Sequence, residues 1–339
     1  MSEKGGQETI ERIDEFIAGQ APLAFLNDFD AALQGREERL PDRASESVAE
    51  LAWLLYDLAR NHLYMLRVGN LKLVQIAKGI RWAIEAGNPT VQISLVRSLL
   101  EHTAALSFQF EKLSGIQDDL SRQADVEKLK SALARHQTVL NRIYFNQVAL
   151  RAEREEKHFH VNDFRKSLRK DYPDEERAYD ELCEFVHPNC GSNYLVSSGV
   201  LGSGILDRPH SDYAAEIEAA GACARKCLEL ADRYEKAASV LLIKLDSRIE
   251  IAGTPGARTT TIFSEKGLSH TGDGSSKENA ICFSKSRTHI EAVEMIGRFV
   301  ASQGMDFRGR SIAGLEKGFL FETVHTDRGL LWFKTKTDW

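Results

Sequence analysis

Helical periodicity runs through most of this chain and constrains its fold more than any other feature. From Glu8 to about Ile251, apolar residues recur at intervals of three and four positions, which places them on one face of an α-helix. The predicted helices span residues 8–18, 22–33, 43–66, 71–86, 90–113, 116–158, 162–170, 174–186 and 212–251. Glycines mark the expected helix ends and prolines the expected starts: Gly19, Gly35, Gly69, Gly87 and Gly115, then Pro22, Pro41, Pro89 and Pro173.

The character of the sequence changes after residue 252. Residues 253–256 read Gly-Thr-Pro-Gly, which ends the last long helix and predicts a linker. Beyond it, short β-prone runs predict strands at 259–263, 280–284, 318–325 and 330–335, with one amphipathic helix at 289–302. Because short joints between long helices favour antiparallel neighbours, the predicted fold class is mainly α. It comprises an antiparallel helical bundle over residues 1–252 and a small α+β domain over residues 257–339.

Net charge and the chain's first residues bear on the class of function. A formal net charge of −6 argues against a protein that coats nucleic acid non-specifically. Apolar runs are interrupted by charged residues before they reach the roughly 18 residues of a membrane span, so we expect no membrane partner. The first eight residues lack the apolar stretch of a secretory signal, and the five cysteines are an odd number. We therefore expect a cytoplasmic protein with reduced thiols.

One predicted helix carries ionisable residues within an otherwise apolar sequence. Residues 91–108 are mostly Val, Ile, Leu, Ala and Phe, and Arg97, Glu101 and His102 interrupt them. A charged side chain in a buried helix needs a partner, because losing water costs several kcal/mol per ion. On a helix, Arg97 and Glu101 lie about 40° apart, whereas Arg97 and His102 lie about 140° apart. The segment fits a structural Arg97–Glu101 ion pair, a catalytic site or another ligand pocket.

The order Arg97-Ser-Leu-Leu-Glu101-His102 resembles the R-x4–6-H motif of the HEPN superfamily. That resemblance covers roughly residues 90–204 and implies a helical, metal-independent endoribonuclease that acts as a homodimer, with a role in toxin or antiviral systems. It implies that His102 moves a proton during attack on an RNA phosphate and that Arg97 stabilises the charge that develops. The segment from Glu184 to Pro188, Glu-Phe-Val-His-Pro, strengthens a resemblance to bacterial helical proteins loosely associated with HEPN-like domains. It adds His187 to the candidate catalytic residues Arg97, Glu101 and His102.

Two further features belong to the same region. A Gly/Ser-rich stretch follows His187, and its residues Ser197, Ser198 and Gly199 could bind phosphate through backbone amides, or simply form a connecting loop. Two helical i,i+4 pairs could together hold zinc: Cys183 with His187, and Cys223 with Cys227. Buried cysteines are more often small hydrophobic residues, so the sequence predicts neither a metal nor a nucleotide cofactor.

Two functions remain open from sequence. The first is an RNA-cleaving, HEPN-like homodimer. The second is a non-catalytic helical scaffold or sensor that binds a protein or a small ligand. A heptad-like pattern after Val126, interrupted by His136 and Gln147, fits either a dimer contact or packing inside the bundle. The exposure of Arg97 distinguishes the two functions, since a ribonuclease needs it exposed and a scaffold leaves it paired with Glu101.

Overall fold

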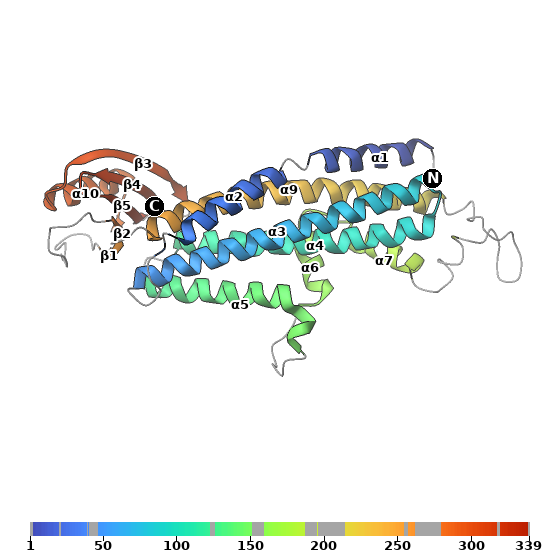
Figure 1. Cartoon of the computed structure of the whole chain (residues 1–339), viewed down its shortest axis with the longest axis horizontal. Helices are drawn as coiled ribbons and strands as arrows, with labels where there is room; N and C mark the ends of the chain where they lie inside the picture. The colour runs from blue at the N-terminus through green and yellow to red at the C-terminus, as the bar shows by residue number, and fades with distance from the viewer. Residues whose placement is uncertain are drawn as a thin grey trace, which may run out of the picture. The chain divides into compact units, whose positions relative to one another are not determined.

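A computed structural model describes residues 3–19, 22–38, 40, 47–122, 126–150, 159–186, 195, 214–253, 257–261, 279–316 and 319–337. The fold is mainly α, with a small α+β portion at the C-terminal end of the chain, as the sequence predicts (Figure 1). The helices before the sheet are α1 Glu3–Ala18, α2 Pro22–Glu37, α3 Ser47–Glu85, α4 Pro89–Arg122, α5 Val126–Leu150, α6 Val161–Leu168, α7 Glu175–Val186 and α9 Ala214–Gly253. None of these described helices is both long enough and apolar enough to cross a bilayer.

Three of the expected helix ends are wrong, because α2 continues through Gly35, α3 through Gly69 and α4 through Gly115. A helical glycine costs only about 1 kcal/mol relative to alanine, which the packing of a long helix can offset. The expected end at Gly87 is correct. Gly87 has a φ of 62°, its N–H donates to the Ile84 carbonyl, and the Asn88 N–H donates to the Ala83 carbonyl. These two bonds close the helix, and Pro89 begins the next one.

Contacts between residues divide the chain into two compact units, each built from three stretches. The first unit contains Met1–Asp28, His62–Lys112 and Arg142–Val240, and the second contains Phe29–Asn61, Leu113–Asn141 and Leu241–Trp339. The helices α3, α4 and α9 therefore each contribute residues to both units. The domain boundary at residues 253–256 stays a prediction.

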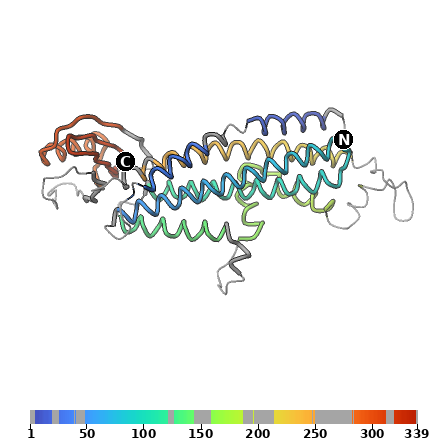
Figure 2. Tube along the Cα trace, in the orientation of Figure 1, coloured from blue at the N-terminus to red at the C-terminus, as the bar shows by residue number. Residues whose placement is uncertain are grey.

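Within the first unit, α3 and α4 pack closely and run in opposite directions, as the Cα trace shows (Figure 2). A Cβ atom on Gly79 would lie 2.8 Å from Leu95 Cδ1, and Gln109 donates to the His62 carbonyl at 3.1 Å. Residue numbers increase along α3 in the direction in which they decrease along α4, as expected for antiparallel helices. This antiparallel pair presents the α4 side chains considered below to α6 and α7.

The second unit contains a five-stranded mixed sheet in the order β1-β2-β5-β4-β3. Its strands are β1 Ala257–Thr261, β2 Asn279–Ser286, β3 Phe307–Glu316, β4 Phe319–Thr326 and β5 Leu330–Thr337. Strand β3 was not predicted from sequence, because its glycines and arginines obscure the β pattern and its pairing with β4 is irregular near Gly309 and Gly314. In the turn between β4 and β5, the Thr326 N–H donates to the Gly329 carbonyl at 2.9 Å.

The two faces of this sheet have different neighbours. Helix α10, His289–Ser302, covers one face, with Ile296, Phe299 and Val300 against Phe333. On the other face, Lys334 donates to the backbone carbonyl of Leu120 near the end of α4. Both faces are thus occupied within the second unit.

Candidate functional site

Arg97 and Glu101 lie one turn apart on α4 and form an ion pair. Arg97 Nε donates to Glu101 Oε1 at 3.3 Å, and the two side chains are 23% and 30% exposed. Tyr179 of α7 joins them, because its hydroxyl accepts from Arg97 Nη2 at 3.2 Å and donates to Glu101 Oε1 at 3.0 Å. The three side chains, which we call the Arg97 cluster, close a ring of hydrogen bonds between α4 and α7.

Burial and the charge of Glu101 favour the protonated form of Tyr179. Burial raises the pKa of the Tyr179 hydroxyl; the hydrogen bond from Arg97 opposes this shift and the negative charge of Glu101 adds to it. A hydroxyl that keeps its proton can donate to Glu101 while it accepts from Arg97. The arrangement therefore gives Arg97 and Glu101 hydrogen-bond partners within the protein.

Helix α6 supplies a second arginine to the same tyrosine. Arg165 Cζ lies 3.5 Å from the centre of the Tyr179 ring, and its guanidinium pairs with Glu175, whose side chain is 0% exposed. Arg169 donates to the other carboxylate oxygen of Glu175 at 2.9 Å. A buried carboxylate with two arginine partners is well compensated for its loss of water. These contacts fix α6 and α7 against each other.

His102 is oriented by its own helix. Its Nδ1 lies 2.8 Å from the Ser98 carbonyl oxygen, which makes Nδ1 the protonated nitrogen because a carbonyl only accepts. Among the described contacts, none joins His102 to Arg97 or Glu101. The structure therefore brings together Arg97 and Glu101, but it does not aim His102 at the same point.

The structure describes only some of the other predicted site residues. His187, Ser197, Ser198 and Gly199 lie outside the described residues. Of the four residues considered for zinc, Cys183, Cys223 and Cys227 are described, and no group of three or more potential ligands forms in the described part of the chain. The hydrogen bond with Cys223 and burial both raise the pKa of Cys227, so this thiol stays protonated.

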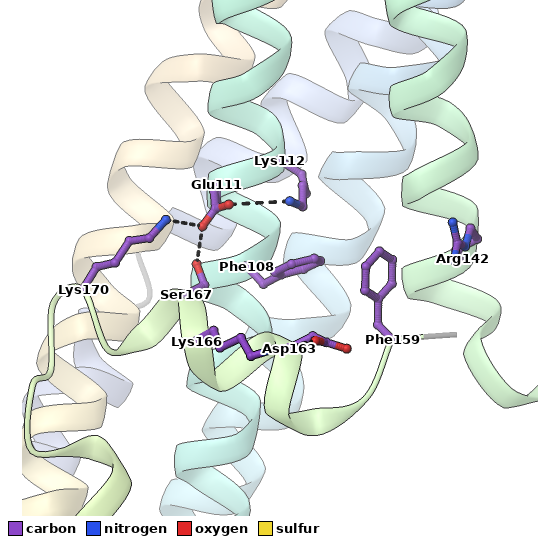
Figure 3. A pocket seen from close by; sticks show the side chains of 9 residues that line it. All are labelled: Phe108, Glu111, Lys112, Arg142, Phe159, Asp163, Lys166, Ser167 and Lys170. Carbon is purple, nitrogen blue, oxygen red and sulfur yellow. Dashed lines mark hydrogen bonds and ion pairs between the residues drawn. The ribbon is translucent and has the colours of Figure 1, made fainter. Parts of the chain in front are cut away.

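A hollow that sequence analysis did not identify lies between α4, α6 and the described end of α5 (Figure 3). Its volume is about 430 Å³. Lys166 and Lys170, one turn apart at 162–170, were a sequence signal for a basic helix face. Glu111, the partner of Lys170, lies 59 residues earlier in the sequence, on α4. Nothing in the sequence indicates that pairing.

No protein-family model matches the chain, and the comparisons with curated proteins and with solved structures found no match either. The resemblance to the HEPN superfamily therefore stays a prediction.

Proposed function

We propose that this chain is a non-catalytic helical binding protein and that the Arg97 cluster is part of its framework. The observation that supports this proposal is the closed set of contacts around Arg97. Its guanidinium donates to Glu101 and to Tyr179 at the same time and lies 5.3 Å from the centre of the Tyr179 ring. An arginine that stabilises a reacting phosphate has donors aimed at the substrate instead.

The position of His102 supports the same proposal. A general acid or base must come within about 3 Å of the proton that it transfers, directly or through one water molecule. Here Nδ1 is bound to the backbone of its own helix, and the ring lies about 140° around that helix from Arg97. Nε2 stays available for proton transfer, but for one phosphate to contact both residues within a single copy of the chain, at least one of them would have to leave this position. An RNA substrate and a homodimer belong to the alternative function, ribonuclease activity.

The proposal is tested by measuring RNA cleavage and stability together. We expect purified protein in EDTA to leave RNA intact. We expect Arg97→Ala to lower the free energy of unfolding by about 1–2 kcal/mol, since it leaves Glu101 and Tyr179 with unpaired hydrogen-bonding atoms. The matched control is Arg177→Ala on α7, which removes an exposed i,i+4 ion pair to Glu181 and should change stability by less than about 0.5 kcal/mol.

Cleavage of RNA in EDTA that disappears in folded Arg97→Ala and His102→Ala variants would overturn the proposal and support the ribonuclease. Equal stability losses in Arg97→Ala and Arg177→Ala would contradict the structural role of the Arg97 cluster. Circular dichroism of each variant before the assay shows whether a variant that lacks activity is still folded.

A further inference from the structure

The hollow between α4, α6 and α5 carries an excess of positive charge. Four cationic side chains line it: Lys112, Arg142, Lys166 and Lys170. Two carboxylates, Glu111 and Asp163, lie among them, so the lining has a formal charge of +2. The whole chain has a formal charge of −6. A cationic hollow in an anionic protein raises the local concentration of anions.

Aromatic rings form the apolar part of the hollow and carry two of its cations. Lys112 Nζ lies 4.4 Å from the centre of the Phe108 ring, and Arg142 Cζ lies 5.3 Å from the centre of the Phe159 ring. The two rings meet edge to face with centres 5.0 Å apart. Figure 3 shows them between Arg142 on one side and the α6 side chains on the other. A ring face attracts a cation without cancelling its charge. Lys112 Nζ also lies 3.5 Å from Glu111 Oε1, in an ion pair.

Lys170 and Lys166 also form ion pairs, and these lie near the surface. Lys170 Nζ lies 2.7 Å from Glu111 Oε2, and Lys166 Nζ lies 3.2 Å from Asp163 Oδ1. The side chains of Lys170 and Lys166 are 66% and 69% exposed. Exposed pairs of this kind contribute at most about 1 kcal/mol, so either lysine can turn towards a ligand at little cost.

Glu111 is the group with which an incoming anion must compete. Its Oε2 accepts from Lys170 and from the Ser167 hydroxyl, the latter at 2.9 Å. Burial raises the pKa of Glu111, but the hydrogen bonds from Lys170 and Ser167, with the charge of Lys112, more than reverse that effect and leave it lowered. Glu111 is therefore ionised at neutral pH and occupies a position that attracts negative charge. A ligand anion would take over some of these donors.

We propose that this hollow binds a small organic phosphate monoester. The inference deepens the proposed binding function and rests on it. A phosphate monoester carries a charge between about −1.5 and −2 at neutral pH, which matches the lining. The volume of about 430 Å³ falls within the usual range for small-molecule sites, and the two phenylalanine rings offer an apolar surface to the organic group. Inorganic phosphate alone would use the cations but not the rings.

Calorimetric titration with three probes tests the proposal: adenosine monophosphate, inorganic phosphate and adenosine, in a buffer free of phosphate. We expect the monophosphate to bind most tightly, inorganic phosphate more weakly, and adenosine not at all. Affinity for the monophosphate should fall as salt is added, because salt screens charges near the surface.

Single substitutions locate the site. Lys166→Gln should weaken monophosphate binding several-fold, whereas Glu111→Gln should strengthen it several-fold because it removes the competing carboxylate. Lys72→Gln on α3 is the matched control, since Lys72 is an exposed lysine that does not line the hollow. It should leave the affinity unchanged.

Two results would overturn the inference. One is the absence of monophosphate binding at concentrations up to about 10 mM. The other is binding that responds equally to Lys166→Gln and Lys72→Gln, which would place the ligand elsewhere. Neither result would decide the proposed function, because that function is tested by measuring RNA cleavage and this inference by measuring ligand binding.

Discussion

At the scale of single residues, Lys334 is notable because it is a lysine whose side chain is buried. It lies on β5 with 0% of its surface exposed, and its ammonium donates to the Leu120 carbonyl. Rings of Phe319 and Phe321 lie 4.9 Å and 5.9 Å from Nζ. Burial, reinforced by the positive charge of Arg248 and opposed by Asp119, lowers the pKa of Lys334 to about 7. An unfolded lysine has a pKa of about 10.4.

This difference predicts how stability changes with pH. Between about pH 7 and pH 10 the unfolded chain binds one proton more at Lys334 than the folded chain does, so the free energy of unfolding rises with pH in that range. The unfavourable contribution of Lys334 is complete below about pH 7 and disappears as the pH approaches 10. We expect Lys334→Met to remove about 2 kcal/mol of this rise between about pH 6 and pH 9.

Urea denaturation at the two pH values measures the effect. Lys336→Met is the matched control, because Lys336 is exposed on the same strand two residues further along. Parallel pH profiles for the wild type and Lys334→Met would show that Lys334 titrates normally, contrary to this expectation.

The Arg97 cluster illustrates which residue contacts a sequence can predict. The Arg97–Glu101 pair follows from i,i+4 spacing on one helix, so local geometry was sufficient. Tyr179 and Arg165 come from α7 and α6, and Tyr179 stands 82 positions from Arg97. Contacts over that separation depend on how the helices pack, which the pattern of one helix does not encode. The hollow lined by α4 and α6 could not be predicted for the same reason, because it depends on how these helices pack.

At the scale of elements, glycines inside the long helices have different surroundings. A Cβ atom on Gly69 would have no heavy atom within 4 Å, whereas a Cβ atom on Gly79 would lie 2.8 Å from a methyl carbon of Leu95. Both residues lie within α3. Only Gly79 therefore has a packing role, at the close approach of α3 and α4.

We expect Gly69→Ala to raise the free energy of unfolding by about 0.5–1 kcal/mol, because alanine is the better helix former. In Gly79→Ala the same gain is opposed by displacement of the end of the Leu95 side chain, so its stability should be lower than that of Gly69→Ala by up to about 1 kcal/mol. Thermal or urea unfolding of the pair compares them directly. Equal stabilisation in both variants would show that Leu95 moves freely and that the approach is not tight.

At the scale of the whole molecule, the second unit joins the sheet to parts of the long helices. Arg248 of α9 lies 4.5 Å from the centre of the Phe321 ring and 4.8 Å from the centre of the Trp332 ring. Phe321 and Trp332 are 2% and 4% exposed. Without α4 and α9, this apolar sheet face would meet water, at a cost of about 25 cal/mol per Å².

We therefore expect residues 257–339 not to fold cooperatively when expressed alone. The fragment should bind a hydrophobic dye and lack the sharp unfolding transition of the complete chain. A fragment with a cooperative transition and no dye binding would contradict this expectation, and it would support the domain boundary that the sequence predicts at residues 253–256.

The overall class of the fold was predictable because helical periodicity and a later change to β-prone runs are local signals. Helix α10 was predicted at its observed bounds, from an amphipathic pattern between clear turn residues. Strand β3 was missed because its sequence lacks regular alternation and its pairing contains irregularities. The division into two units could not be predicted from sequence either, because each unit consists of three separate stretches of chain.

The length of α3 has a consequence for how this chain can change during evolution. Its 39 residues form one unbroken helix that contributes to the core of both units. Each inserted residue turns everything beyond it by about 100° around the helix axis. A single insertion near residue 61 would rotate Leu63, Leu66 and Leu73 away from their buried positions. Insertions within α3 should therefore be tolerated best in lengths of about seven or about eleven residues, which restore the phase of the helix to within about 20°. We expect other changes in chain length to occur in the segments between helices.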